Sequence, residues 1–413
     1  MLSPTSDAMS RDEKRAGASL ASIFALRMLG LFLILPVFAE HARHIPGGEN
    51  LTLVGLAMGA YGLTQALFQI PYGMASDRWG RKPVIIVGLL LFALGSAVAA
   101  LAPDMLWTII GRVIQGAGAI SAAVTALAAD LTRDQHRTKV MAMIGSSIGV
   151  VFAVSLVAAP LLYSVVGMAG IFWLTAILAL AAIGLVTNVV PTPPPPHPGP
   201  KVPFSEVLLN GQLMRLNFGI FTLHLCQMAM FVAVPGLLIK SGDLALASHW
   251  KVYLPVVLVS FTLMVPAIII AEKRQKMKPI FLVAVALLVL TQAVLGLGRE
   301  SFVALVAGLL IFFTAFNILE ASLPSIISRV APPRAKGAAL GVYNTTQAIG
   351  LFLGGALGGW LSQNIGSGAV FIACGGLALT WLAVAAGMQP PPLRMGQGVA
   401  ANTPAHGILN DKP

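Results

Sequence analysis

Ionisable side chains inside long apolar runs are the residues of this sequence that could carry out chemistry. Glu320 stands in the run IFFTAFNILEASL and His224 in the run FTLHLCQMAMF. Burial disfavours the charged form of a carboxylate, and histidine changes charge between about pH 5 and 8. Asp130, at the end of another apolar run, is a third candidate. We predict that one or more of these three groups takes up and releases a proton.

Glu320 is the leading candidate of the three. At about 1.5 Å per helical residue, it lies roughly 8 Å from the centre of its predicted span. A charged group inside a bilayer is a functional candidate by default. The alternatives are an ion pair between Glu320 and Arg27 across the bundle, and a neutral, hydrogen-bonded His224 that only fills space.

Amide side chains form polar stripes on the same predicted helices. Asn217, His224 and Gln227 are spaced seven and three residues apart, which puts them on one side of a helix. Such stripes predict the lining of a cavity for a small molecule. The alternative is hydrogen bonding between helices, worth about 0.6 kcal/mol each. The predicted cavity residues are Arg27, Gln65, Gln69, Arg112, Asn217, Gln227, Asn317, Asn344 and Gln347.

The composition requires an apolar solvent around the elements that position these residues. Hydrophobic residues make up 57% of the 413 and charged residues only 10%, against roughly 25% charged in a soluble domain. The net charge of +11 is spread in short clusters between apolar runs, unlike a nucleic-acid surface. Histidine, cysteine and acidic residues show no metal-ligand spacing and no nucleophile–base set, so we expect no metal, no cofactor and no enzyme.

Apolar runs of about 20 residues predict an all-α membrane protein, because unpaired backbone groups are too costly in lipid. The predicted spans are 18–39, 52–74, 83–102, 105–129, 140–163, 168–190, 213–238, 251–271, 279–297, 301–328, 338–361 and 367–388.

Lysine and arginine set the predicted orientation. With the N-terminus inside, most of the 26 basic residues lie in cytoplasmic segments, and the outer segments hold only Arg43, Lys240, Lys251 and Arg299. This asymmetry predicts that both termini are cytoplasmic in a bacterial inner membrane.

The proline-rich stretch PTPPPPHPGP, residues 191–200, cannot be helical and divides the spans into two sets of six. The similar segments RKPVI (81–85) and MKPIF (277–281) each open the third helix of a set. We expect a cytoplasmic N-terminal segment (1–17), a six-helix bundle (18–190), a linker (191–212), a second six-helix bundle (213–388) and a disordered cytoplasmic tail (389–413). Nothing requires more than a monomer.

The segment GMASDRWGRK, residues 73–82, follows the second span and resembles the signature loop of the major facilitator superfamily. The resemblance implies the major facilitator fold and a latch between the halves when the cavity faces outward. In that latch Asp77 and Arg81 meet the start of the eleventh helix, Asp130 is the charge partner of Arg81, and glycines leave room for docking. A basic, topology-setting turn is the alternative. The implied gating residues are Gly73, Asp77, Arg78, Gly80, Arg81, Asp130, Gly337 and Gly341.

Two further stretches resemble signatures of the same superfamily. Arg112 and Gln115, in GRVIQG, share one helix face, and the alternative for Arg112 is a purely structural bond to backbone carbonyls. The fifth span has the glycines of an antiporter signature, Gly145 and Gly149, but alanine precedes Pro160 where glycine is expected. This motif therefore does not decide between export and uptake.

Residues 15–390 resemble the YajR-like, drug-efflux-like group of the superfamily, for example LRMLG (26–30), YGLTQ (61–65) and FNILEA (316–321). The soluble C-terminal domain of that group is expected to be absent. The resemblance implies proton-coupled efflux (antiport) of small amphipathic organic compounds by alternating access. A metabolite exporter or an uptake symporter on the same fold is the alternative, and a non-transporting receptor or enzyme is a remote one.

Overall fold

The computed structural model describes residues 9–192, 204–332 and 335–390, and over these residues it contains helices and turns. Residues 1–8 of the predicted N-terminal segment, 193–203 of the linker and 391–413 of the tail lie outside the described residues. The helices are α1 (Arg11–Phe32), α2 (Leu35–Ala42), α3 (Leu51–Trp79), α4 (Arg81–Ala100), α5 (Met105–Ala117), α6 (Ser121–Asp130), α7 (Asp134–Asn188), α8 (Phe204–Leu208), α9 (Gly211–Gly242), η1 (Leu246–Ser248), α10 (Trp250–Lys273), α11 (Met277–Leu297), α12 (Phe302–Val330), α13 (Lys336–Asn364) and α14 (Ser367–Ala386).

Ten helical stretches among the described residues are long and apolar enough to cross a bilayer. One of them, Lys139–Asn188 within α7, has 50 residues, or about 75 Å at 1.5 Å per residue, against a hydrocarbon core of about 30 Å. Gly167, with φ of 65°, interrupts the helical backbone, so α7 crosses twice. Helix α13 has 29 residues and many glycines, and adds one more crossing. The predicted all-α membrane fold with twelve crossings is confirmed.

Two crossings are made of paired short helices. A turn at Leu33 and Ile34, followed by Pro36, separates α1 from α2, because proline cannot donate a backbone hydrogen bond. A break at Gly118, where no proline is present, separates α5 from α6. The first helix also begins earlier than predicted, because Ser10 and Glu13 form a capping box that starts α1 at Arg11.

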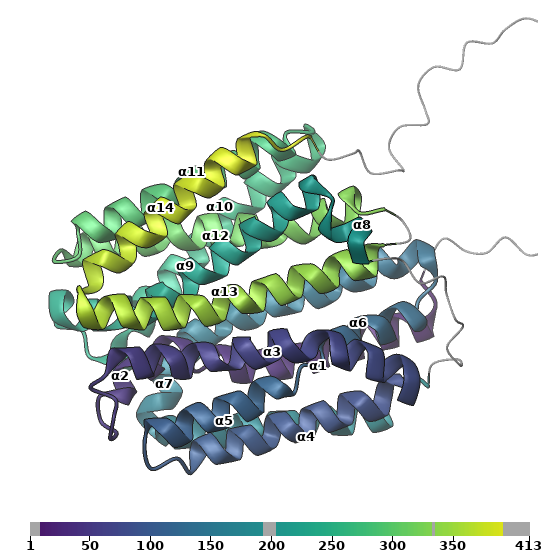
Figure 1. Cartoon of the computed structure of the whole chain (residues 1–413), viewed down its shortest axis with the longest axis horizontal. Helices are drawn as coiled ribbons and strands as arrows, with labels where there is room; N and C mark the ends of the chain where they lie inside the picture. Colours follow the sequence, from purple (N-terminus) through teal and green to yellow (C-terminus); the bar gives the residue numbers. More distant parts are fainter. Residues whose placement is uncertain (1–8, 193–203, 333–334, 391–413) are drawn as a thin grey trace, which may run out of the picture.

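Helices α1–α7 and α9–α14 form two groups, with α3 and α13 side by side along their boundary (Figure 1). Glycine allows these two helices to touch through their backbones. A Cβ atom at Gly59 would lie 2.6 Å from the carbonyl oxygen of Phe352, and one at Gly55 would overlap the backbone of Gly355. The backbone N–H of Leu51 also donates to Oε1 of Gln363 at 2.8 Å. The halves are therefore closed at the end where α3 begins.

The same two helices are not in contact at their other ends. A Cβ at Gly337 or at Gly341, in the first turns of α13, would meet nothing within 4 Å. Met74 and Trp79, in the last turns of α3, are exposed. The molecule is closed where α3 begins and α13 ends, and it is open where α3 ends and α13 begins.

Candidate functional site

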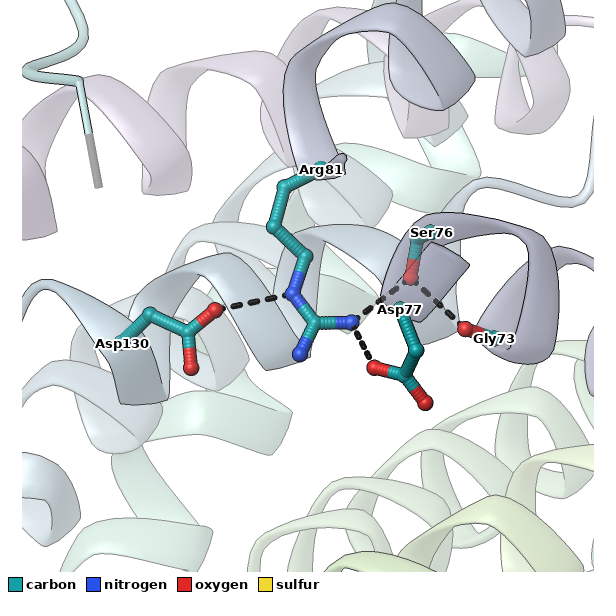
Figure 2. A network of polar contacts seen from close by, with 5 residues as sticks. All are labelled: Gly73, Ser76, Asp77, Arg81 and Asp130. Atoms are coloured by element: carbon teal, nitrogen blue, oxygen red, sulfur yellow. Dashed lines mark hydrogen bonds and ion pairs between the residues drawn. The ribbon is translucent and has the colours of Figure 1, made fainter. Parts of the chain in front are cut away.

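Three helix ends meet in a charged cluster at the open end of the molecule (Figure 2). Arg81, the first residue of α4, donates from Nε to Asp130 Oδ2 at the end of α6, at 2.8 Å. Its Nη1 donates to Ser76 Oγ at 2.8 Å and also pairs with Asp77 on α3. Ser76 in turn donates to the carbonyl of Gly73 at 2.8 Å. The cluster clamps α3, α4 and α6 together, and Ser76 is a member that sequence reasoning missed.

The predicted signature loop is almost entirely helical. Helix α3 continues through Trp79, and Gly80 alone, with φ of 93°, makes the turn into α4. This backbone conformation favours glycine because a Cβ would clash there. The expected cytoplasmic loop is thus corrected to a single-residue turn, and Arg78 is an exposed residue in the last turn of α3.

Asp77 lies on the open side of the cluster, with 67% of its side chain exposed. It pairs with Arg81, and the structure shows no bond from it to α13 among the described residues. Gly337 and Gly341, the implied docking glycines, have open space around them. The implied latch between Asp77 and α13 is therefore disengaged in this conformation, as the resemblance implies for a cavity that does not face outward.

Arg81→Gln should destabilise this half of the protein. Arg81 is only 13% exposed and Asp130 30% exposed, so the substitution leaves a partly buried carboxylate without its cation. Losing a hydrogen bond to a charged group costs about 1–3 kcal/mol, which lowers Tm by about 1–3 °C in a protein of this size. Arg78→Gln, on the same segment, is the matched control and should leave Tm unchanged in detergent. An equal Tm for both variants would contradict the clamp.

A second polar group lies in the interior of the other half. His224 on α9, Glu320 on α12 and Gln347 on α13 converge there, although each comes from a different helix. Glu320 Oε1 lies 3.3 Å from His224 Nε2, and Gln347 Nε2 lies 2.7 Å from the same ring nitrogen. The His224 ring is buried, while 29% of the Glu320 side chain is exposed. Two of the three predicted proton carriers are thus neighbours.

The hydrogen bonds of this group limit where its protons can be. Nδ1 of His224 lies 3.2 Å from the carbonyl oxygen of Ile220, so Nδ1 carries a proton and donates it. In a neutral ring Nε2 then accepts from the Gln347 amide. Oε1 of Glu320 is buried and makes no hydrogen bond. A second proton, on either the carboxyl or Nε2, would supply the missing donor between Glu320 and His224.

Other polar residues of this half lie on the same three helices. Asn317, one turn before Glu320 on α12, donates to Ser260 Oγ at 3.1 Å. Asn217 is buried on α9, and its Oδ1 has no hydrogen-bond partner. The hydroxyl of Tyr343, one turn before Gln347 on α13, is also buried and without a partner. Gln227 is buried on α9, and Asn344 is partly exposed on α13.

Arg27 is fully buried in the first half. The alternative that it pairs with Glu320 is wrong, because its partners lie in its own half. It donates to Ser121 Oγ at 3.0 Å, to Gln65 Oε1 at 3.4 Å and to the hydroxyl of Tyr61. Its guanidinium also lies 5.7 Å from the centre of the Tyr61 ring. Among the described residues no carboxylate pairs with it. Hydroxyls, an amide and a ring face stabilise this charge instead.

Arg112 is also buried against the same tyrosine, 5.1 Å from its ring centre. It bonds to Gln115, which shares its helix face, and to the carbonyl oxygen of Ala57 at 3.3 Å. Gln69, on α3, is buried with both amide atoms unbonded. These side chains, with Gln65 and Arg27, lie inside the first half rather than on an open surface. None of them lines the cavity described below, and their place in a cavity lining stays a prediction.

A shallow, open cavity of about 610 Å³ lies between α1 and α7 on the open side of the molecule. It runs from Lys139 at the start of α7 to Val151, and Ala21 and Ala25 of α1 form its other wall. Met143, Ser146, Ser147 and Val150 complete the lining. The walls are mostly apolar with two hydroxyls and one ammonium group. The four-residue spacing of Lys139, Met143, Ser147 and Val151 along α7 could have indicated this wall from the sequence.

Phenylalanine rings follow the cavity wall in the chain and link it to the other half. Phe152, next in the chain after Val151, lies 5.0 Å from Phe32 of α1 and 5.4 Å from Phe316 of α12, measured between ring centres. Phe316 in turn lies 5.8 Å from the His224 ring. The rings therefore join the cavity wall of one half to the Glu320–His224 pair of the other.

Comparison with known proteins agrees with this architecture. The Major Facilitator Superfamily matches the chain at residues 19–355 and, in a second alignment, at 278–406. The inner membrane transport protein YajR of Escherichia coli K12 is 46% identical over 389 residues, which are 93% of this chain and 85% of that protein. The multidrug resistance protein MdtH of Photorhabdus laumondii is 29% identical over 352 residues, covering 81% of this chain and 84% of MdtH.

A solved structure shares the fold at lower identity. The human organic anion transporter MFSD10 superposes with a TM-score of 0.71 and 20% identity, covering 91% of this chain and all of that one. The family match spans most of the chain, and the helices, the charged cluster and the two halves are those of a transporter. The chain belongs to the major facilitator superfamily and is a multi-pass membrane transporter of the secondary type.

Proposed function

We propose that this transporter is a proton-coupled exporter of small amphipathic organic compounds. It would work by antiport and alternating access in a bacterial inner membrane. The observation that carries the proposal is the position of Glu320: a carboxylate oxygen is buried beside an imidazole nitrogen at 3.3 Å, and no hydrogen bond satisfies it. Adding or removing one proton changes whether Glu320 and His224 can form a hydrogen bond, and this changes the stability of the conformation.

The cavity supports the choice of cargo. Its walls of alanine, valine and methionine suit an apolar molecule, and Ser147 and Lys139 offer polar contacts near the mouth. A volume of about 610 Å³ falls within the usual range of small-molecule sites, roughly 300–1,000 Å³. The 29% relationship to a multidrug resistance protein fits the same cargo class.

Coupling follows from the contact between cavity and proton site. A proton or a cargo molecule shifts the balance of inward and outward states only by its differential affinity for them. Phe152 and Phe316 lie between the cavity wall and the Glu320–His224 pair. Cargo that displaces these rings would change the surroundings of Glu320, and proton release would change the space left for cargo.

The direct test is a proton-exchange assay in everted membrane vesicles. Respiration acidifies the vesicle interior and quenches acridine orange, and a compound that exchanges for protons restores the fluorescence. We expect amphipathic compounds to restore it only in vesicles that contain the transporter. Uptake that needs a gradient of the opposite sense would establish symport instead. Transport that is unchanged after nigericin collapses the gradient would refute proton coupling.

We propose that both termini and the Asp77–Arg81–Asp130 cluster face the cytoplasm. In a variant with Cys226→Ala and Cys374→Ala, a cysteine at exposed Met74 should react with a membrane-impermeant maleimide only in everted vesicles. A cysteine at exposed Glu49, which lies at the closed end, should react only in intact spheroplasts. The reverse labelling pattern would overturn the orientation and, with it, the direction of export.

A further inference from the structure

The turn between α10 and α11 concentrates positive charge at the open end of the molecule. Lys273, Arg274, Lys276 and Lys278 fall within six positions, and the first three are exposed. Within the described part of the chain, the structure gives none of the four an ion-pair partner. Each is free to bind an anion from outside the protein.

The backbone of this turn gathers the four side chains. Gln275 has a φ of 56°, so the chain reverses within three residues between the end of α10 and the start of α11. Lys276 precedes α11, and no side chain caps the first N–H groups of that helix. Unbonded N–H groups at a helix start add to an attraction for anions that the basic side chains already provide.

The turn is held rigidly and its nearest acid is already engaged. Glu272, next to Lys273, is ion-paired with Arg329 of α12. Ala271 and Met277, on either side of the turn, are buried. The positive side chains therefore project from a fixed base, and the charge of Glu272 is directed towards α12.

Apolar side chains that face the surroundings continue from the charged turn along both helices. Ile269 and Ile270 of α10, and Val283 of α11, are exposed within two turns of it. A ligand that fits has a negatively charged head and an apolar body at the boundary between bilayer and water. We propose that this turn binds the phosphodiester headgroup of an anionic phospholipid, whose acyl chains lie along α10 and α11.

A second basic cluster, with three exposed basic residues, offers a comparison. Arg11, Lys14 and Arg15 are exposed at the start of α1, but Asp12 and Glu13 are interspersed with them, and Glu13 bonds Arg133. Each uncompensated basic residue near an anionic surface strengthens binding about fivefold. The α10–α11 turn should therefore bind anionic lipid far better than the start of α1.

The test uses the purified full chain and counts bound lipids by native mass spectrometry. Dioleoylphosphatidylglycerol is compared with dioleoylphosphatidylcholine, which has the same chains and no net charge. We expect the wild-type chain to hold the anionic lipid at least ~10-fold more strongly. Replacing Lys273, Arg274, Lys276 and Lys278 with glutamine should abolish the preference for the anionic lipid. Replacing Arg11, Lys14 and Arg15 with glutamine should leave that preference unchanged.

Measurements on the unmodified chain keep the proposal testable if the fourfold variant does not fold. The preference for the anionic lipid should fall as salt rises, and inorganic phosphate at equal concentration should not displace the lipid. Displacement by phosphate would show a simple anion site and overturn the proposal. Equal binding of both lipids by the wild-type chain, or equal loss in the two variants, would overturn it as well.

Discussion

Glu320→Gln should abolish proton-driven transport while leaving the protein folded. Glutamine keeps the size of the side chain and can donate to His224 Nε2, so it imitates the protonated carboxyl permanently. Cargo should still bind, and exchange of cargo down its own gradient should continue. Uphill transport in proteoliposomes with an imposed pH gradient should fall to the level of protein-free liposomes, because no proton cycle remains to drive it.

The matched control is Glu300→Gln, the same substitution at an exposed turn between α11 and α12. It should retain wild-type uphill transport. If Glu320→Gln also retained it, Glu320 would be removed as the proton carrier, and Asp130 would be the next residue to substitute. The pH dependence of cargo exchange should disappear in the Glu320→Gln variant, because glutamine does not titrate.

Gly59→Val should open the end of the molecule that is closed in this structure. A Cβ at this position would meet the Phe352 backbone at 2.6 and 3.0 Å, and backbone atoms cannot rotate out of the way. Overpacking of this kind costs about 1–3 kcal/mol, which changes the ratio of the two conformations by roughly 5- to 150-fold. The strain arises only where α3 touches α13. It therefore destabilises this conformation and does not affect a conformation in which the two helices are apart at this end.

Spin labels at exposed Glu49 and Asn364, in a chain without its two cysteines, would report the change. The label distance should be short in the wild-type background and should lengthen with Gly59→Val. Gly337→Val places the same side chain on α13, where a Cβ has open space, and should leave the distance as it was. A distance unchanged by Gly59→Val would show that this contact does not hold the closed end.

Much of the fold could be predicted from composition and periodicity, because the bilayer imposes the length and polarity of every crossing. The break in α7 illustrates the limit of that reasoning. Gly167, a single residue with positive φ, separates the two crossings of α7. The sequence predicted the boundary between the crossings, but it did not predict that the helix continues on both sides of one residue. The signature segment was expected as a loop for a similar reason: Gly80 alone suffices to turn the chain.

The candidate site was only partly foreseeable. Glu320 and His224 stand out in the sequence because each is ionisable within an apolar run, but their proximity depends on how α9 packs against α12. Tyr61 and Ser121, which hold Arg27, carried no signal, since a tyrosine or serine in a span is common. The pairing of Glu320 with Arg27, which was the alternative, is not formed, because Arg27 finds neutral acceptors and ring faces within its own half.

The phenylalanine contact between the halves also bears on the cell's energy balance. Rings from α1, α7 and α12 touch at centre-to-centre distances of 5.0 to 6.0 Å, which leaves no room between them for a file of water molecules along which protons could hop. We therefore expect these rings to limit proton leak through an idle transporter in this conformation. Trimming Phe152 to alanine should breach that seal, and growth would slow most where respiration already limits the membrane potential.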